Sequence, residues 1–248
     1  MGVIHTILRG VEKQVLRGLG KGHGTKSILT EIRGIRGLLA GDVTLCVDIG
    51  GNVGNYTAAL LDVFPDAKVV TFEPSATNLA KLRERFGAEA RVSLVPAAVS
   101  QLDGEATLYA DTPGSGLGSL SKRDLDHLNI GFECAETVQT IRFETFWKTA
   151  LDSQKIDILK LDIEGHEMDA LTGAGAALAQ TRAIQFEFGG SNIDTRTYFK
   201  DFWAFFRDHG FDLHRITPFG TLPVTKYSER DECFTTTNYI AIAQGQGR

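Results

Sequence analysis

Residues 47–57 read VDIGGNVGNYT and constrain the fold more than any other part of the chain. The preceding residues, TLCV over 44–47, are short, apolar and β-branched, as in a buried strand. Apolar residues then recur with helical spacing at Tyr56, Leu60 and Phe64. A strand, a glycine-rich turn and a helix in this order form the unit on which α/β domains hold nucleotide cofactors.

The segments after Gly41 continue the alternation of strand and helix. Predicted strands cover residues 43–49, 67–73, 91–95, 156–161, 182–188, 211–216 and 236–243, and predicted helices lie near 54–63, 75–86, 165–172 and 196–209. This pattern predicts an α/β fold with a mostly parallel seven-stranded sheet. The connection TPFGTLPV leaves no room for a helix, so the last strand is expected to run antiparallel at the end of an open sheet. Residues 102–143 interrupt the alternation with short β-like pieces around a glycine-serine loop.

A helical N-terminal arm over residues 1–40 is expected ahead of a domain over residues 41–248. Apolar residues from Val3 to Leu19 recur on one helix face, and a second helical stretch covers 25–39. The arm holds seven Lys/Arg and two Asp/Glu, a net +5, whereas residues 41–248 hold 19 and 29, a net −10. Three uses of the arm remain open: packing on the body, which we expect, contact with a membrane surface, or pairing with another subunit in a homo-oligomer.

Charge and cysteine content limit the class of partner and the compartment. The formal charge is −5, which argues against a general nucleic-acid partner. Cys46, Cys134 and Cys233 show no paired spacing, which favours a reducing compartment, so we expect a cytoplasmic protein. No apolar run approaches the ~20 residues that would make a transmembrane segment.

The glycine turn distinguishes between two nucleotide cofactors. A dinucleotide site of the G-x-G-x-x-G type requires a second glycine where this chain has Asn52. Asp48, at the strand end, would repel a pyrophosphate but attract the sulfonium and ammonium groups of S-adenosylmethionine. Gly50 and Gly54 permit close approach of the backbone, and Asn52 tolerates a left-handed turn. We therefore expect S-adenosylmethionine rather than NAD.

The next two strand ends supply further cofactor candidates. Glu73, in VVTFEPS, follows Gly54 at the distance expected of an acid that binds ribose hydroxyls. Pro74 follows it directly, and Ala98 lies in VPAAVS, where small side chains let the backbone approach an adenine ring. Tyr56 completes this predicted cofactor set.

A second cluster of charged residues lies in DILKLDIEGHE, residues 157–167. Lys160 and Asp162 alternate with leucines, and Asp162, Glu164 and Glu167 crowd the end of this predicted strand. Glu187 ends the next predicted strand, in IQFEFGG, at the same sheet edge. Carboxylates gathered in a cleft repel each other unless a cation, a proton or a lysine intervenes. Helix capping by Glu164 or Glu167 accounts for one acid, but not for all of them with Lys160.

The chain resembles the FkbM family of S-adenosylmethionine-dependent methyltransferases in five segments. They occur in the order VDIGGNVGNYT, VVTFEPS, VPAAVS, DILKLDIEGHEMDALTGA and IQFEFG. The resemblance covers roughly residues 44–243. It implies a Rossmann-like methyltransferase fold and O-methylation of a hydroxyl, often on a sugar, a glycan or a natural product. His166 departs from the family pattern, in which a small residue is common.

The resemblance and the residues together define the expected chemistry. An alcohol oxygen needs a base or a metal, and the base candidates are Asp162 and His166. Lys160 is expected to steer charge or to hold Asp162 ionised, and Asp162 also counts among the cofactor-binding candidates. Asp162 and Glu187 would be the ligands if a divalent metal is used. An NAD-type oxidoreductase and a non-catalytic nucleotide-binding domain are the alternatives.

Overall fold

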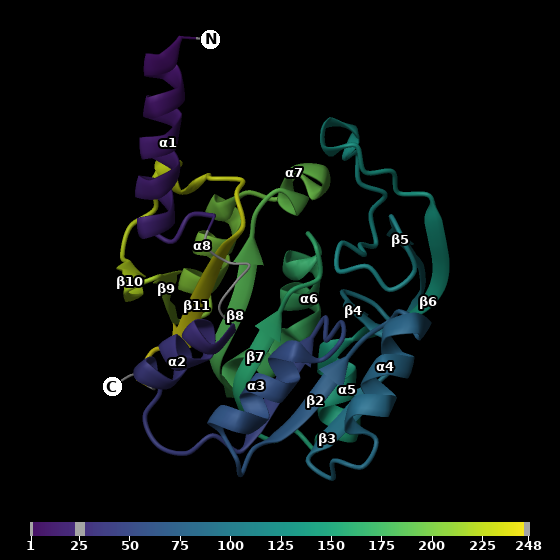
Figure 1. The fold of residues 1–248 in the computed structure, drawn as a ribbon. Coiled ribbons are helices and arrows are strands. Elements are labelled where there is room, and N and C mark those ends of the chain that lie inside the picture. Colours follow the sequence, from purple (N-terminus) through teal and green to yellow (C-terminus); the bar gives the residue numbers. More distant parts are fainter. Residues whose placement is uncertain (1, 23–27, 246–248) are drawn as a thin grey trace.

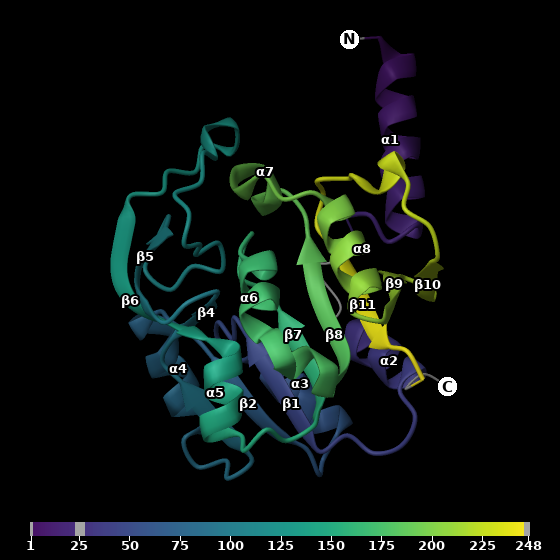
Figure 2. The same cartoon turned by 180° about the vertical axis from the view of Figure 1, so that it is seen from behind.

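The computed structural model describes residues 2–22 and 28–245, in which eight strands form one sheet between two layers of helices (Figures 1 and 2). The strands are β1 (Leu45–Ile49), β2 (Lys68–Phe72), β3 (Val92–Val95), β7 (Ile156–Leu161), β8 (Thr181–Phe188), β9 (Phe211–Thr217), β10 (Gly220–Val224) and β11 (Thr237–Ala243). The helices are α1 (Val3–Gly18), α2 (Ile28–Leu38), α3 (Asn55–Val63), α4 (Ala76–Phe86), α5 (Phe143–Ala150), α6 (Glu167–Ala174), α7 (Ser191–Thr195) and α8 (Phe199–Asp208). Short 3-10 turns cover Asp126–Leu128, Gly175–Gln180 and Glu229–Asp231.

The order of the strands places a topological switch beside β1. The order is β10-β9-β11-β8-β7-β1-β2-β3, so the chain runs outward from β1 to β3 and then crosses to β7 on the other side of β1. Strands β8, β7, β1, β2 and β3 are mutually parallel. Open parallel sheets bind ligands beyond the carboxyl ends of their strands at such a switch. The ends of β1 and β7 are therefore where a site is expected.

The Rossmann-like class is confirmed, but the antiparallel end of the sheet differs from the prediction in two ways. The last strand, β11, lies between β8 and β9 and is antiparallel to both, so it is not at the sheet edge. The edge is β10, an eighth strand from the segment that was expected to be a connection. Pro223 lacks a backbone donor, and an edge strand tolerates this because one of its sides has no partner strand.

The β-like pieces predicted within residues 102–143 form two strands of a second, smaller sheet, which a short strand before them completes. Its strands are β4 (Ala98–Ser100), β5 (Gly104–Ala110) and β6 (Cys134–Arg142), in the order β4-β6-β5. The loop between β5 and β6 extends over the carboxyl edge of the large sheet (Figure 1). This loop brings residues far along the chain to the ends of β1 and β7.

Apolar side chains cover both faces of the large sheet. Helices α2 and α3 pack on one face, and α5, α6 and α8 pack on the other with a group of stacked phenylalanines (Figures 1 and 2). In α2, Ile32 and Ile35 are fully buried beside Leu60 of α3. The second helix of the predicted arm therefore belongs to the core of the domain.

Helix α1 contradicts our expectation that the arm packs on the body. None of its residues is buried, and it projects away from the sheet (Figure 1). Residues 23–27, where the second arm helix was expected to begin, lie outside the described residues. None of the described helices combines the length and apolarity needed to cross a bilayer.

Candidate functional site

Two cavities meet beyond the carboxyl ends of β1 and β7. The narrow cavity has a volume of about 200 Å³ and lies under the β5–β6 loop. The wide cavity, of about 980 Å³, opens toward α2, α7 and the segment before β11. Both are lined by Gly50, Asn52, Gly116, Asp162 and Glu164. Two ligands held in these cavities would face each other at those five residues.

The glycine turn after β1 forms one wall of the narrow cavity. Gly50 has φ +86° and Asn52 has φ +47°, so the left-handed conformation expected at Asn52 is confirmed. A Cβ on Gly50 would lie 1.9 Å from the carbonyl oxygen of Asp162. Only glycine, which has no Cβ, avoids this clash. At Gly54 a Cβ would lie 2.4 Å from Phe86 of α4. Gly50 therefore joins the ends of β1 and β7, and Gly54 allows α3 and α4 to pack.

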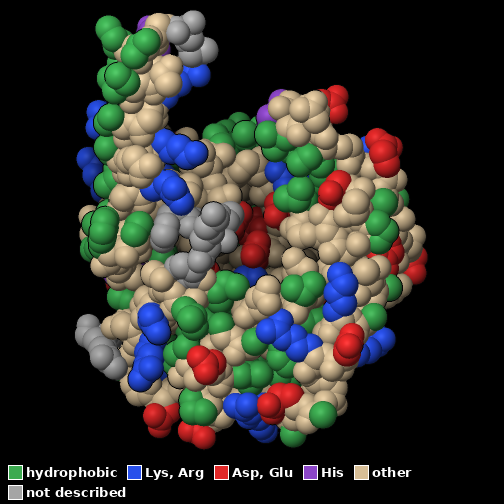
Figure 3. All heavy atoms as spheres, viewed as in Figure 1, with side chains coloured by type: hydrophobic (Ala, Val, Ile, Leu, Met, Phe, Trp, Pro, Cys, Tyr) green, Lys and Arg blue, Asp and Glu red, His purple; other side chains and the backbone are tan. Residues whose placement is uncertain are grey.

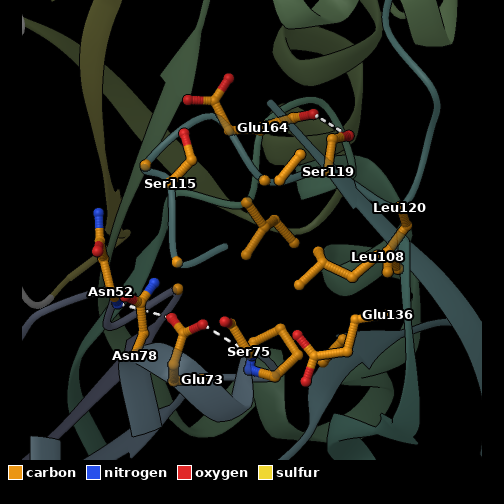
Figure 4. A pocket seen from close by; sticks show the side chains of 18 of the residues that line it. Asn52, Glu73, Ser75, Asn78, Leu108, Ser115, Ser119, Leu120, Glu136 and Glu164 are labelled. Carbon is orange, nitrogen blue, oxygen red and sulfur yellow. Dashed lines mark hydrogen bonds between the residues drawn. The ribbon is translucent and has the colours of Figure 1, made fainter. Parts of the chain in front are cut away.

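Glu73 lies at the floor of the narrow cavity and holds the turn in place. Its carboxylate accepts hydrogen bonds from the backbone N–H of Asn52 at 2.7 Å and of Ser75 at 2.9 Å (Figure 4). Burial raises its pKa to about 7, although these hydrogen bonds oppose the shift. The Asn78 side chain is a third hydrogen-bond partner, and of about four lone-pair sites on the carboxylate one remains for a ligand hydroxyl.

The other walls of the narrow cavity fit a nucleoside. Apolar side chains line it, among them Pro74, Ala98 and Leu108 (Leu108 is labelled in Figure 4). The hydroxyl of Ser75 is buried there without a hydrogen-bond partner among the described residues. A flat apolar base between such walls, with hydroxyls directed at Glu73 and Ser75, satisfies these groups.

Lys160 is the charged centre between β1 and β7. Its ammonium lies 3.3 Å from carboxylate oxygens of both Asp48 and Asp162, and 5.0 Å from the centre of the Tyr56 ring. Burial alone lowers the pKa of this lysine, but the Asp162 and Asp48 carboxylates outweigh burial and raise it above its ordinary range. Lys160 is therefore a fixed positive charge rather than a base.

Two residues predicted to bind the cofactor, Asp48 and Tyr56, do not line the narrow cavity. Asp48 is fully buried, accepts a hydrogen bond from Thr57 at 2.7 Å, and lines neither of the two cavities. Asp48 forms an ion pair with Lys160, because the pairing of β1 with β7 places these two residues next to each other. Tyr56 lines the wide cavity and donates a hydrogen bond to Gln185 at 2.6 Å.

Six carboxyl groups line the wide cavity: Glu31, Asp124, Asp162, Glu164, Glu187 and Asp194. Acidic side chains are visible in the hollow of Figure 3. Burial raises the pKa of Glu31 to about 7. Burial, followed by the charges of Asp162 and its neighbours, raises the pKa of Glu187 well above its ordinary value. The cavity thus offers both hydrogen-bond donors and acceptors, which suits a ligand rich in hydroxyl groups.

Glu164 connects the site to the β5–β6 loop. It adopts a left-handed backbone with φ +51°, and its carboxylate accepts a hydrogen bond from Arg123 at 2.7 Å. Arg123 also contacts Asp194 of α7 at 3.0 Å. Burial and the Asp162 charge raise the pKa of Glu164 to about 8, against the effect of Arg123. Our sequence analysis missed Arg123, because its loop carries no motif.

His166 has both ring nitrogens engaged. Nδ1 lies 2.8 Å from Asp169, and Nε2 lies 3.0 Å from the Ser121 hydroxyl. The ring lines the narrow cavity but not the wide one. Glu167 performs the capping role considered for it, since its carboxylate accepts hydrogen bonds from the backbone N–H groups of Ile163 and Gly165.

Glu31 is a second residue of the site that the sequence analysis missed. Its carboxylate accepts hydrogen bonds from Gln185 at 2.7 Å and from Asn238 at 3.3 Å. An acid between Ile28 and Ile32 on an otherwise apolar helix face was the available signal. The arm thus contributes a buried carboxyl group to the wide cavity.

The described residues contain no group of three or more His, Cys, Asp or Glu side chains arranged to hold a metal ion. Of the two tentative ligands, Asp162 contacts the ammonium of Lys160, and Glu187 borders the wide cavity.

Comparison with known proteins places this architecture among methyltransferases. Residues 48–213 match the methyltransferase FkbM domain. The chain is 28% identical to the 2-O-methyltransferase NoeI of Sinorhizobium fredii over 173 residues, which cover 65% of this chain and 70% of NoeI. It is 27% identical over 149 residues to Methyltransferase 1 of Beauveria bassiana, covering 53% of this chain and 59% of that protein.

A solved structure supports the fold. SMU.1697c of Streptococcus mutans, assigned as a methyltransferase and solved in complex with SAH, superposes with a TM-score of 0.50 at 11% identity. The match covers 88% of this chain and 98% of that one. At this identity the likeness concerns the fold alone.

Proposed function

The chain belongs to the FkbM methyltransferase family, and we propose that it is an S-adenosylmethionine-dependent O-methyltransferase acting on a hydroxyl of a sugar, glycan or natural-product acceptor. The observation that carries the proposal is the junction of the two cavities at Gly50, Asp162 and Glu164. The 2-O-methyltransferase activity in the name of the NoeI relative favours oxygen as the acceptor atom.

The narrow cavity is proposed to hold the nucleoside half of the cofactor. Glu73 would accept the ribose hydroxyls, and Pro74, Ala98 and Leu108 would enclose the adenine. Gly50 and Asn52 would let the cofactor chain pass toward the wide cavity. When bound, S-adenosylmethionine supplies an electrophilic methyl group on a sulfonium.

Asp162 is proposed to accept the proton of the acceptor hydroxyl as the oxygen–carbon bond forms and the carbon–sulfur bond breaks. The hydroxyl becomes strongly acidic while its oxygen gains the methyl group, so a carboxylate is a sufficient base. Lys160, 3.3 Å from Asp162, would orient this carboxylate before the transfer. The proton would thus end on the Asp162 carboxylate.

Glu187 and Glu31 are proposed to hold the acceptor. Burial raises the pKa of both groups, and in its protonated form each carboxyl group would donate a hydrogen bond as well as accept one. Alignment of oxygen, methyl carbon and sulfur by such contacts accounts for much of the rate of a methyl transfer.

Calorimetric titration with S-adenosylmethionine, with its demethylated product and with NAD tests the proposal. We expect the first two to bind and NAD not to bind. Transfer of a labelled methyl group to a panel of sugars and polyhydroxylated compounds then tests the acceptor class. Binding of NAD alone would identify the oxidoreductase, and failure to bind any nucleotide would contradict the assignment of the narrow cavity.

A further inference from the structure

Helix α1 presents a continuous apolar face to solvent. Val3, Ile4 and Val11 are 76%, 72% and 56% exposed, and Ile7, Leu8, Val15 and Leu19 are also exposed. No residue of the helix is buried. An exposed apolar face of this size marks an interaction surface.

The shape of this face indicates a flat partner rather than a single helix. At 3.6 residues per turn, the seven apolar side chains spread over about 160° of the helix circumference. A two-stranded coiled coil uses a narrower stripe of alternating three- and four-residue spacing. Four turns with a wide apolar arc match helices that lie in the plane of a membrane interface.

Phe219 extends the apolar face onto the body. It lies in the turn between β9 and β10 and is 89% exposed, more than any other large hydrophobic residue described as exposed. A Cβ on Gly18 would lie 3.9 Å from its ring, so the ring stands against the last turn of α1. An aromatic ring at the foot of an amphipathic helix suits the boundary between headgroups and acyl chains.

The charge of the helix is complementary to an anionic surface. Arg9, Lys13 and Arg17 recur every fourth residue on the side opposite the apolar face and are exposed. Residues 41–248 carry a net charge of −10, which an anionic surface would repel. Basic side chains are visible along the projecting helix in Figure 3.

The base of α1 is fixed to the body. Lys21 lies 3.5 Å from Asp231, and the N–H of Gly22 donates to the carbonyl oxygen of Thr236 at 2.9 Å. These contacts join the helix to the segment before β11. These contacts therefore fix the orientation of α1, and of its apolar face, relative to the large sheet.

We propose that α1, with Phe219, docks this protein on the surface of an anionic lipid bilayer without crossing it. The apolar face would enter the acyl boundary, and the three basic residues would remain near the anionic headgroups. The wide cavity, lined by Gly22 and Ile28 after α1, would then lie close to that surface. The proposal does not depend on the reaction that the protein catalyses.

Co-sedimentation of the full chain with lipid vesicles tests the docking. We expect binding to vesicles of 70% phosphatidylcholine and 30% phosphatidylglycerol, at least tenfold tighter than to phosphatidylcholine alone, and weaker in high salt. The double variant Ile7→Asp/Val11→Asp should lose binding. Leu102→Asp, at a residue 71% exposed on the body, is the matched control and should bind as the native chain does.

The basic residues are tested separately. Replacing Arg9, Lys13 and Arg17 by Gln should weaken binding to the anionic vesicles roughly 100-fold, at about 1 kcal/mol for each basic residue. Far-ultraviolet circular dichroism and melting temperature should not change in any variant, because the altered side chains are exposed.

A second copy of the chain is the competing partner. Sedimentation velocity in the absence of lipid measures it in the same variants. A dimer that becomes monomeric in Ile7→Asp/Val11→Asp, together with no vesicle binding by the native chain, would overturn the proposal. Equal binding of both aspartate variants to vesicles would also overturn it.

Discussion

At the residue scale, Lys160 determines how the site is charged. It lies between the buried Asp48 and the more exposed Asp162, at 3.3 Å from each carboxylate. One lysine thus links a structural acid to a proposed catalytic acid. The effects of substituting the two aspartates can be measured separately. Asp48 is buried and lines neither cavity, whereas Asp162 lines both.

The proposed base is tested by Asp162→Asn, which keeps the shape of the side chain but cannot take up the proton. We expect methyl transfer to slow by about 10²–10⁴-fold, while affinity for S-adenosylmethionine changes only a few-fold. His166→Ala is the rival test and should slow transfer less than tenfold, because both ring nitrogens already have protein partners. A larger loss in His166→Ala than in Asp162→Asn, measured under single-turnover conditions, would reverse the assignment.

The two acids predicted to bind the cofactor should now behave differently. Glu73→Ala should weaken S-adenosylmethionine binding by about 1–3 kcal/mol, the size of a buried hydrogen bond to a charged group. Asp48→Asn should instead lower the free energy of unfolding by about 3 kcal/mol, because it removes one partner of a buried ion pair. Calorimetric titration and urea unfolding on both variants separate these effects. A direct cofactor contact at Asp48 would show as an affinity loss as large as that of Glu73→Ala.

We expect activity to be unchanged by EDTA and by added Mg²⁺ or Mn²⁺. The ammonium of Lys160 already supplies a positive charge beside Asp162, which is one of the two tentative metal ligands. The measurement is the initial rate after chelation and gel filtration. Activity lost with EDTA and restored by Mg²⁺ would instead support Asp162 and Glu187 as ligands.

At the scale of elements, the turn between β1 and α3 connects three strands through backbone contacts. The N–H groups of Gly50 and Gly51 donate to the carbonyl oxygen of Phe72, and the N–H of Asp162 donates to that of Ile49. Side chains would separate these chain segments. The glycines are therefore required by packing at the ends of β1, β2 and β7 as well as by the proposed cofactor.

Gly50→Ala tests this element. A Cβ there would lie 1.9 Å from the carbonyl oxygen of Asp162 at a positive φ, so the turn must move. We expect a loss of at least 2 kcal/mol of unfolding free energy, an order-of-magnitude figure for backbone strain, and at least tenfold weaker cofactor binding. Gly37→Ala in α2 is the control, because no atom lies within 4 Å of the added Cβ. It should stabilise the protein by up to about 1 kcal/mol.

At the scale of the whole molecule, the site concentrates carboxyl groups whose pKa values lie above the ordinary 4.5. Burial raises the pKa to about 7 at Glu31 and Glu73 and to about 8 at Glu164. The folded protein therefore binds more protons than the unfolded chain between those values and 4.5. In that window the free energy of unfolding falls as pH rises.

The expected result is a decrease in the melting temperature of the ligand-free protein from about pH 5 to about pH 8. Glu187→Gln should flatten this decrease, since its pKa is also raised well above the ordinary value. Glu12→Gln, at an exposed residue of α1, serves as the control and should leave the profile unchanged. Differential scanning calorimetry across the range measures the slope. A melting temperature that rises through this window would contradict the burial of these groups.

Local sequence patterns predicted most of the elements after Gly41, although not helix α5, and they identified the residues proposed for the cofactor side of the site. Strand periodicity, which depends only on neighbouring residues, predicted seven of the eight strands of the large sheet and missed the edge strand β10. The glycine turn, Glu73 and the acids after β7 were found for the same reason, because each lies at the end of a strand whose position is set by apolar spacing.

Only the tertiary structure decided which side chains meet. Asp48 was expected at the cofactor, but the pairing of β1 with β7 directs it to Lys160 beneath the turn. Arg123 and Glu31 reach the site from a loop and from the arm, across 41 and 154 residues to their partners Glu164 and Gln185, and no local spacing encodes contacts over such distances. Helix α1 shows the converse limit, because its amphipathic pattern predicts an apolar interaction surface, whereas the fold shows that no residue of this helix is buried against the body.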